Sequence, residues 1–128
     1  MTIRVMIADD DPMVRRTLSN ALGRVGFDVC TSADGIAAIR LAEVAPPDIV
    51  LVDLNMPMGG TELVARLKAM YGREVWVAVL SGEDPDEIRA ECLAAGADDV
   101  LVKPISPVEL RRRLLAAAPA GKTLPVAS

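Results

Sequence analysis

Acidic, hydroxyl and basic residues follow the apolar runs of this chain at positions where they could handle a phosphoryl group. Asp9 and Asp10 come directly after the first apolar run, at residues 3–8. Asp53, Ser81 and Lys103 each come directly after one of three later runs. Carboxylate oxygens are ligands that Mg²⁺ prefers, an aspartate can attack phosphorus as a nucleophile, and a lysine can neutralise charge on the transferred group. If these residues meet in the fold, their types predict transfer of a phosphoryl group to an aspartate beside a metal ion.

Three carboxylates gathered in one place would repel one another, and the prediction has to include what offsets that repulsion. Two unit charges about 4 Å apart repel by about 4 kcal/mol at the effective dielectric constant of a protein surface. A divalent cation such as Mg²⁺ or Mn²⁺ would offset this cost. The Ser81 hydroxyl could then donate a hydrogen bond to one phosphoryl oxygen, and the Lys103 ammonium could pair with another. The set therefore includes ligands for a cation and donors for an anion.

Each of these residues alone also has a simpler structural explanation. An aspartate pair after a strand is more often a helix cap with a solvated turn, and Asp11 before Pro12 is assigned to that role here. A serine at the end of a buried strand is usually a turn residue, and a lysine before a proline is usually a surface charge. The functional interpretation therefore depends on the residues converging in the fold.

The apolar runs predict the strands that must position these residues. Four runs are continuous aliphatic stretches rather than alternating ones, as in strands that are covered on both faces. They span residues 3–8, 49–52, 75–80 and 100–102, and a fifth, less apolar run at 27–31 is expected at a sheet edge.

Helical spacing fills the segments between the strands. The spacing is clearest at Val14, Leu18, Ala21, Leu22 and Val25, and at Leu63, Val64, Leu67, Met70 and Tyr71. Capping residues precede prolines in the pairs Asp11 with Pro12, Asp84 with Pro85 and Ser106 with Pro107, and Ser106 with Glu109 makes a capping-box pattern. Five alternating strand–helix units predict an α/β fold, a doubly wound five-stranded parallel sheet with helices on both faces. Ligands of such sheets bind beyond the carboxyl ends of the strands, so the polar residues are expected at one rim.

Length and composition indicate one compact domain and exclude several functions. The 128 residues fit a domain at residues 1–118, followed at 119–128 by a disordered tail or the start of a linker. A net charge of −4 disfavours binding of nucleic acid or of an anionic membrane surface. The sequence has no histidine, which excludes Ser-His-Asp and Cys-His catalysis. The N-terminal residues resemble neither a signal peptide nor a membrane span, so we expect a cytoplasmic protein.

Four spaced motifs resemble those of response-regulator receiver domains of two-component signalling. They are IADDDP at 7–12, VDLNMP at 52–57, LSG at 80–82 and LVKP at 101–104, and the similarity covers residues 2–118. The resemblance implies a flavodoxin-like (βα)5 fold with strand order 2-1-3-4-5. It also implies that Asp53 accepts a phosphoryl group from a histidine kinase or a histidine phosphotransfer protein. The phosphorylated chain would then bind an unknown downstream protein with changed affinity, as a switch rather than an enzyme.

The resemblance also implies a set of metal ligands. Asp10 and Asp53 would bind Mg²⁺ or Mn²⁺ through their carboxylates, and Asp9 would bind the ion through a water molecule. The backbone carbonyl of Asn55 would complete the protein ligands.

Other positions would contact the phosphoryl group or respond to it. Lys103 would pair with the phosphoryl group, the Ser81 hydroxyl would move toward it on activation, and Gly82 would leave room for it. Pro104 would follow Lys103 in an often cis peptide. Val100 stands where the family usually has an aromatic switch residue, so a rotating ring cannot transmit the signal. We expect the loop after the fourth strand and the helix that follows to respond instead, because that helix is weakly apolar.

Two positions predict the lifetime of the phosphoryl group. Members of the family tune it two residues beyond the acceptor and two beyond the switch hydroxyl, and here these residues are Asn55 and Glu83. The pair resembles that of chemotaxis receivers that lose the phosphoryl group rapidly, so we expect a short-lived phosphoryl state. The loop after Pro57 reads MGG and is one residue shorter than is usual in the family. The resemblance therefore does not predict the path of this loop near the site.

Two other functions fit parts of the pattern. A Mg²⁺-dependent phosphohydrolase with an aspartyl nucleophile would carry a cap insertion over the site, and we find no such insertion. A degenerate receiver used only as an interaction module would lack some motif positions, and all of them are filled here. A weak homodimer through the fourth helix, fifth strand and fifth helix would use the arginines at 111–113, although a pair between Glu109 and Arg113 on a solvated helix face explains those arginines better.

Overall fold

Five strands and five helices alternate along the chain, as the sequence pattern predicts. The computed structural model describes residues 2–82 and 85–117. The elements are β1 (Arg4–Ala8), α1 (Pro12–Arg24), β2 (Asp28–Ser32), α2 (Gly35–Val44), β3 (Ile49–Asp53), α3 (Gly60–Tyr71), the short 3-10 helix η1 (Gly72–Glu74), β4 (Trp76–Ser81), α4 (Pro85–Ala95), β5 (Asp99–Val102) and α5 (Pro107–Ala116). Neighbouring strands pair in parallel, in the order β2-β1-β3-β4-β5. The predicted flavodoxin-like sheet and its strand order are confirmed.

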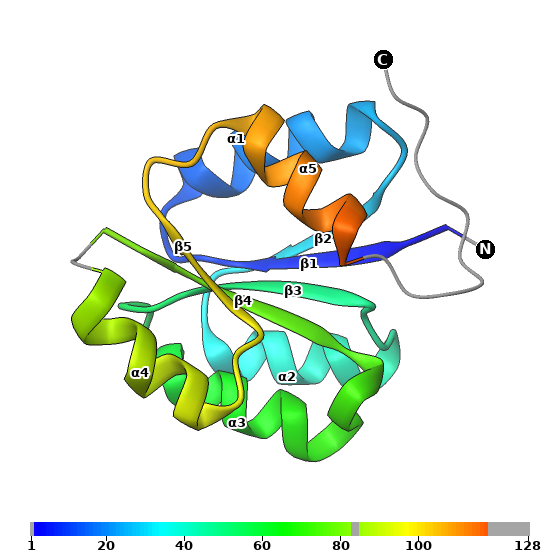
Figure 1. The fold of residues 1–128 in the computed structure, drawn as a ribbon. Coiled ribbons are helices and arrows are strands. Elements are labelled where there is room, and N and C mark those ends of the chain that lie inside the picture. Colours follow the sequence, from blue (N-terminus) through cyan, green and yellow to red (C-terminus); the bar gives the residue numbers. More distant parts are fainter. Residues whose placement is uncertain (1, 83–84, 118–128) are drawn as a thin grey trace.

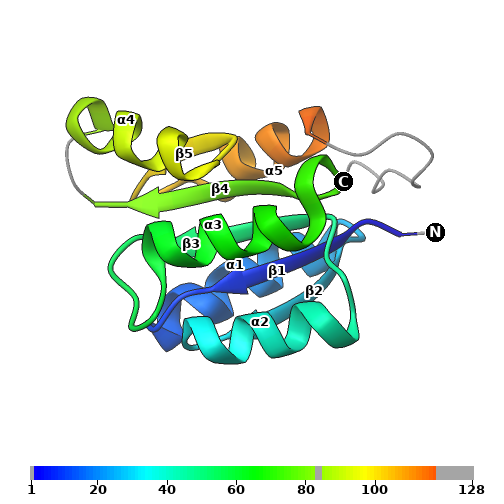
Figure 2. The same ribbon diagram turned by 90° about the horizontal axis from the view of Figure 1, so that it is seen from below.

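The sheet forms the middle layer of three. Figure 1 shows α1 and α5 on one face of the sheet and α2, α3 and α4 on the other. The second view in Figure 2 shows the same layers with the helices running along the strands. Two layers of helices therefore cover both faces, which explains why the strand sequences are continuously apolar.

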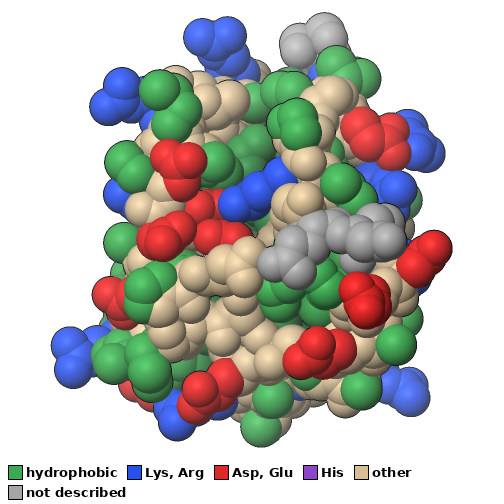
Figure 3. Space-filling model, turned by 90° about the vertical axis from the view of Figure 1, so that its left-hand side faces the viewer, with side chains coloured by type: hydrophobic (Ala, Val, Ile, Leu, Met, Phe, Trp, Pro, Cys, Tyr) green, Lys and Arg blue, Asp and Glu red, His purple; other side chains and the backbone are tan. Residues whose placement is uncertain are grey.

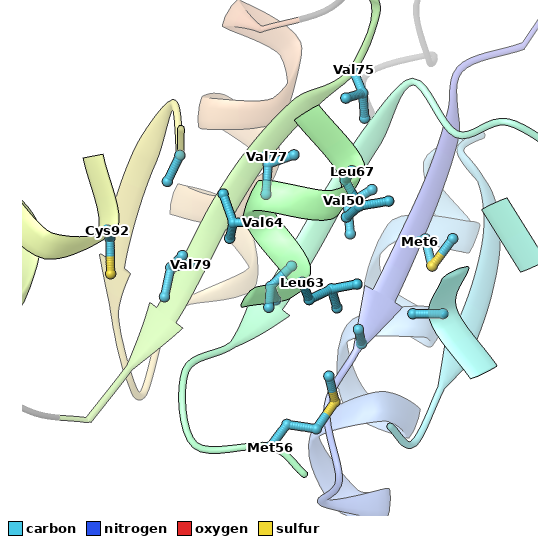
Figure 4. Packing of buried hydrophobic residues seen from close by; sticks show 14 of the residues in the cluster. Met6, Val50, Met56, Leu63, Val64, Leu67, Val75, Val77, Val79 and Cys92 are labelled. Atoms are coloured by element: carbon cyan, nitrogen blue, oxygen red, sulfur yellow. The ribbon is translucent and has the colours of Figure 1, made fainter. Parts of the chain in front are cut away.

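Each strand contributes alternate side chains to two separate cores. In β1, Met6 and Ala8 pack into the core beneath α2, α3 and α4, while Val5 and Ile7 pack into the core beneath α1 and α5. Figure 4 shows the first of these cores, in which labelled residues of the strands and of α3 and α4 lie between the sheet and its helices. All five residues of β3 are buried. The central strand thus fixes the position of Asp53, its last residue.

The predicted helix caps form, with one difference at α5. The Asp11 carboxylate caps α1, and the Ser106 hydroxyl accepts a hydrogen bond from the Glu109 N–H at 3.0 Å. The Glu109 carboxylate binds arginines of α5 instead of reaching back to Ser106, and it lies 3.0 Å from Arg113. Within the described residues the capping box is therefore formed on one side only, while the predicted pair of Glu109 with Arg113 is present. Asp84 lies outside the described residues.

Helix α4 packs against the rest of the protein through a narrow face. Ile88 and Cys92 are buried, whereas Leu93 is 42% exposed. Residues four apart lie on one face of a helix, and the next residue is rotated by about 100° from it. The inward face of α4 is therefore small, whereas its predicted response to the phosphoryl group stays a prediction.

Candidate functional site

The carboxyl ends of β1, β3 and β4 meet at one rim of the sheet, next to the segment that follows β5. Parallel pairing sets Ala8 beside Val52 and Asp53 beside Leu80, so the residues that end these strands or follow them lie close together. Figure 3 views this end of the molecule and shows acidic side chains gathered beside a basic one. The fold therefore brings chemistry-bearing side chains from distant parts of the sequence to one place.

Asp9 is fully buried, and both its main chain and its side chain form polar contacts. Its N–H donates to the Ser32 carbonyl at 3.0 Å, and its carboxylate Oδ1 accepts from the Asp11 N–H at 2.9 Å. Its backbone carbonyl accepts from Arg15 Nη1 at 2.7 Å. Its Oδ2 is buried and pairs with the Lys103 ammonium at 2.9 Å. This oxygen therefore retains lone pairs for a further cationic partner.

Asp53 and Lys103 are coupled by charge. The Asp53 side chain is almost fully buried, and its Oδ1 lies 3.3 Å from Lys103 Nζ and accepts from the Asn55 N–H at 3.3 Å. Burial, and next the charge of Asp9, raise the pKa of the Asp53 carboxyl, while Lys103 acts in the opposite direction. Desolvation lowers the pKa of the Lys103 ammonium, but contacts with Asp9 and Asp53 outweigh it and raise that pKa. One ammonium thus serves two carboxylates.

Asp9, Asp10 and Asp53 form a group that fits a divalent cation. One carboxylate oxygen of each residue lies within 4.8 Å of the others. Asp9 and Asp53 are buried and Asp10 is exposed, so the group opens to solvent at Asp10. Three carboxylates against the single Lys103 ammonium leave excess negative charge, and their hard oxygen atoms suit Mg²⁺.

The other predicted residues lie around this group with different exposures. Ser81 ends β4, is 1% exposed, and its carbonyl accepts from the Lys103 N–H at 2.8 Å. A Cβ atom added to Gly82 would meet nothing within 4 Å among residues 2–82 and 85–117, so these residues leave the position open. Val100 is buried in β5, and the Lys103–Pro104 peptide is cis.

The loop after β3 makes a tight turn that explains its glycines. Met58 and Gly60 both have positive φ, and a Cβ on Gly60 would lie 2.5 Å from the carbonyl oxygen of Leu54. Asn55 is exposed at the start of this loop. The MGG segment therefore turns sharply into α3 through backbone conformations that favour glycine. Glu83, the second residue predicted to tune the phosphoryl lifetime, lies outside the described residues.

An apolar cavity of about 370 Å³ adjoins the acidic group. It is lined by Met13, Val14, Thr17 and Leu18 of α1, by Leu80, and by Lys103, Pro104 and Ile105. Lys103 belongs both to this cavity and to the acidic group, and Met13 is 67% exposed beside it. The sequence analysis did not find the cavity, because it forms only where α1 and the segment after β5 are packed together.

The fold and this site define the class of protein. The sequence model of the response regulator receiver domain family matches residues 5–115, and the chain belongs to this family. It is a phosphoacceptor receiver of two-component signalling, in which Asp9, Asp10 and Asp53 form the acidic pocket together with Lys103. Receivers are signalling switches rather than conventional enzymes, and the acidic triad is typical of their Mg²⁺ site.

Known proteins similar to the chain include transcription regulators and chemotaxis receivers. Transcriptional regulatory protein PrrA of Mycobacterium tuberculosis is 42% identical over 114 residues, which are 88% of this chain and 48% of PrrA. Response regulator MprA of Mycobacterium sp. (strain KMS) is 36% identical over 117 residues, 91% of this chain and 50% of MprA. The chain thus spans about half the length of these curated relatives. The solved structure of chemotaxis protein CheY4 of Vibrio cholerae matches with a TM-score of 0.87 and 32% identity, covering 92% of this chain and 100% of CheY4.

Helix lengths give one further fact about the chain. In the part that the structure describes, no helix combines the length and the apolar character needed to cross a bilayer.

Proposed function

We propose that Asp53 accepts a phosphoryl group from a histidine kinase or a histidine phosphotransfer protein, with Mg²⁺ or Mn²⁺ bound beside it. The phosphorylated chain then binds a downstream protein with changed affinity. One observation supports the acceptor above all: Asp53 Oδ1 lies 3.3 Å from Lys103 Nζ, and the Asp53 carboxylate lies within the oxygen group of Asp9 and Asp10.

The proposed transfer balances without any further reactant. An oxygen of the ionised Asp53 carboxylate attacks phosphorus while the phosphorus–nitrogen bond of the donor phosphohistidine breaks. The electron pair of that bond leaves with the imidazole, which takes up a proton. Lys103 pairs with an equatorial phosphoryl oxygen, and a cation held by Asp10 and Asp53 would supply further neutralising charge. The transfer therefore needs positioned charge rather than a general base.

The ligand roles that we propose follow from what each carboxylate already contacts. Asp10 is exposed and binds the cation directly together with Asp53. Asp9 has its Oδ1 bonded to the Asp11 N–H and its Oδ2 against Lys103, so it acts through a water molecule. The backbone carbonyl of Asn55 is the remaining protein ligand in this proposal.

The response to phosphorylation would begin at the ends of β4 and β5. The buried Ser81 hydroxyl donates to a phosphoryl oxygen, and the open space at Gly82 admits the group. Val100 has no ring to rotate, so the movement passes through the loop after β4 and through α4, whose buried face is small. Asn55 and Glu83 keep the phosphoryl state short-lived, and a phosphoprotein that persists for hours with Mg²⁺ present would contradict this part.

The apolar cavity beside Lys103 supports a protein as the phosphoryl donor. A small donor needs only the charged site, whereas a protein donor needs a surface that holds its histidine near Asp53. The cavity between α1 and the segment after β5, with Met13 exposed at its edge, offers such a surface. Apolar side chains, methionine among them, are enriched at the centres of protein interfaces.

The remaining parts of the proposal concern the extent and setting of the chain. We take residues 1–118 as the receiver and 119–128 as a tail or linker start, although residues 1 and 118–128 lie outside the described residues. We expect the receiver to act in the cytoplasm without binding nucleic acid itself, because its net charge is −4. A weak homodimer through α4, β5 and α5 also stays a prediction, and Arg113 of that surface is already bonded to Asp99 at 2.6 Å.

Intact mass spectrometry after incubation with acetyl phosphate and Mg²⁺ tests the proposal. We expect one phosphate adduct that is lost in Asp53→Asn and in the presence of EDTA. Asp98→Asn is the matched control, because Asp98 lies at the other end of the sheet and pairs with a different lysine. An unmodified wild-type chain would favour a receiver used only as an interaction module, and an adduct that survives in Asp53→Asn would exclude this acceptor. Steady turnover of a free phosphomonoester would revive the phosphohydrolase alternative.

A further inference from the structure

We propose that Arg15 is a positioning residue for the cation site, an inference that rests on the function proposed above. Arg15 Nη1 donates a hydrogen bond to the backbone carbonyl of Asp9 at 2.7 Å. Through this bond Arg15 holds the peptide plane between Asp9 and Asp10, and thereby sets where the Asp10 carboxylate lies relative to Asp53. No sequence motif points to Arg15, because its hydrogen bond is to the main chain and not to a side chain of the site.

Two separate bonds fix the two peptide planes on either side of Asp10. The plane before Asp10 is held at its carbonyl oxygen by the Arg15 guanidinium. The plane after Asp10 is held at its N–H, where Asp11 donates to Asp9 Oδ1 at 2.9 Å. Because each peptide unit is planar, a bond to one atom of the unit restrains its neighbouring Cα atom as well. The backbone of Asp10 is therefore restrained from both sides, and Arg15 provides one of the two restraints.

Asp10 depends on this backbone restraint more than the other carboxylates of the site do. Asp9 and Asp53 are buried and contact Lys103. The exposed Asp10 side chain has no hydrogen bond or ion pair to residues 2–82 and 85–117, yet one of its carboxylate oxygens lies within 4.8 Å of the group. Its position is consequently set by its main chain, and a looser main chain would spread the Asp10 carboxylate over more positions.

Charge and positioning predict opposite effects when Arg15 is replaced. A positive charge near three carboxylates weakens the binding of a further cation, so loss of that charge alone would strengthen Mg²⁺ binding. Loss of a group that orients a ligand weakens metal binding, typically by 10- to 100-fold. Arg15 is partly buried and its hydrogen bond is charge-assisted, so we expect the positioning effect to prevail.

Arg16 is a matched control on the same helix. It is the next residue of α1, it is exposed, and it forms no ion pair with the described residues. Arg16→Ala removes the same charge and the same length of side chain as Arg15→Ala, without removing a bond to the turn. Arg15→Lys keeps the charge and a single donor, and it tests whether the guanidinium reach is needed.

The experiment compares Mg²⁺ affinity and amide exchange in wild type and the three variants. Isothermal titration with MgCl₂ gives the affinity, and hydrogen exchange of the Asp11 N–H in metal-free protein reports the turn independently of any reaction. We expect Arg15→Ala to bind Mg²⁺ about tenfold more weakly. We also expect the Asp11 N–H of this variant to exchange faster than in wild type. We expect Arg16→Ala to match wild type and Arg15→Lys to recover part of the loss.

The outcomes separate this inference from the proposed function. Unchanged or tighter Mg²⁺ binding by a folded Arg15→Ala, with unchanged exchange at Asp11, would overturn the positioning role. If that variant does not fold, an Arg15→Met variant, which keeps most of the side-chain length and removes the donor, would overturn it equally by showing wild-type affinity and exchange. A wild-type chain that binds Mg²⁺ but takes up no phosphate from acetyl phosphate contradicts the proposed function, and the Mg²⁺ comparison still decides the role of Arg15.

Discussion

Each end of the sheet has a lysine that forms an ion pair with an aspartate, but only the end at the carboxyl termini of the strands has the features of a cation and phosphoryl site. At the carboxyl ends of the strands, Lys103 Nζ lies 2.9 Å from Asp9 Oδ2 and 3.3 Å from Asp53 Oδ1, with Asp10 close by. At the amino ends, Lys68 Nζ lies 2.7 Å from Asp98 Oδ2. The residue types are the same, so types alone do not separate a functional pair from a structural one.

The difference lies in how completely each group is satisfied. Lys68 also donates to the carbonyls of Val75 at 2.6 Å and Gly72 at 3.4 Å, and Asp98 Oδ2 also accepts from the Val77 N–H at 2.8 Å. One positive and one negative charge balance there, and neutral main-chain groups take up the rest. At Lys103 one positive charge faces three carboxylates, so that end remains short of positive charge until a cation binds. Excess charge and incomplete bonding, rather than an ion pair as such, indicate the functional end.

The largest expected effect is the loss of phosphorylation in Lys103→Met. Methionine keeps much of the length of the side chain and removes the charge that pairs with the phosphoryl group. We expect the rate of phosphorylation by acetyl phosphate to fall about 100-fold, as it does when one electrostatic donor is removed from other catalytic sites. Stopped reactions followed by intact mass give the rate. A Lys103→Met rate within threefold of wild type would remove the distinction between the two lysines.

For Lys68→Met, at the amino ends of the strands, we expect a loss of stability and an unchanged rate of phosphorylation. The substitution leaves Asp98 without its ammonium partner and two carbonyls without a donor, so we expect the free energy of unfolding to fall by about 2 kcal/mol, less than for a fully buried pair because both side chains are partly exposed. Urea unfolding measures the change. Phosphorylation should proceed at the wild-type rate, and a slow Lys68→Met would show that the two ends are coupled.

The sequence could predict most of this comparison but not its decisive part. The predicted strand ends placed Asp9, Asp53 and Lys103 at one rim, because parallel strands share a direction. The edge strand expected at 27–31 is observed one residue later, as β2 (Asp28–Ser32). Neither the bond from Arg15 to a main-chain carbonyl nor the apolar cavity beside Lys103 leaves a periodic or motif signal, because both arise from tertiary packing.

A smaller effect is expected on the stability of Asp53→Asn without divalent cations. Burial and the charge of Asp9 raise the pKa of the Asp53 carboxyl above 3.8, so the folded chain holds that proton to a higher pH than the unfolded chain does. The stability that comes from this tighter proton binding is fully present below pH 3.8. It is lost as the pH rises through the pKa of Asp53 in the folded chain. Near neutral pH, Asp53→Asn should therefore be more stable than wild type by about 1 kcal/mol in EDTA.

Urea unfolding in EDTA across the acidic to neutral range checks this prediction for Asp53→Asn. The stabilisation should shrink toward low pH, and it should also shrink with saturating Mg²⁺, which binds the wild-type site. Asp98→Asn is the counterpart at the satisfied end, and it should be less stable than wild type near neutral pH. If Asp53→Asn and Asp98→Asn change the free energy of unfolding in the same direction, the two ends of the sheet do not differ in charge balance.

The smallest expected effect concerns an ion-pair group on the exposed surface of α5. On α5 the Glu109 carboxylate accepts hydrogen bonds from Arg112 at 2.6 Å and from Arg113 at 3.0 Å, and these bonds lower the pKa of Glu109 from 4.5 to about 2. Any stability from the pairing of Glu109 with the two arginines is present above pH 4.5. It is lost as the pH falls through about 2. Because the Glu109, Arg112 and Arg113 side chains are all substantially exposed, solvent screens the group, and the loss should be much smaller than that in Lys68→Met. Titration of the Glu109 carboxyl by NMR measures the pKa, and Arg112→Gln should return it toward 4.5 with little change in unfolding. A large loss of stability in Arg112→Gln would show that bonding within an exposed group can matter as much as the completeness of bonding at Lys68.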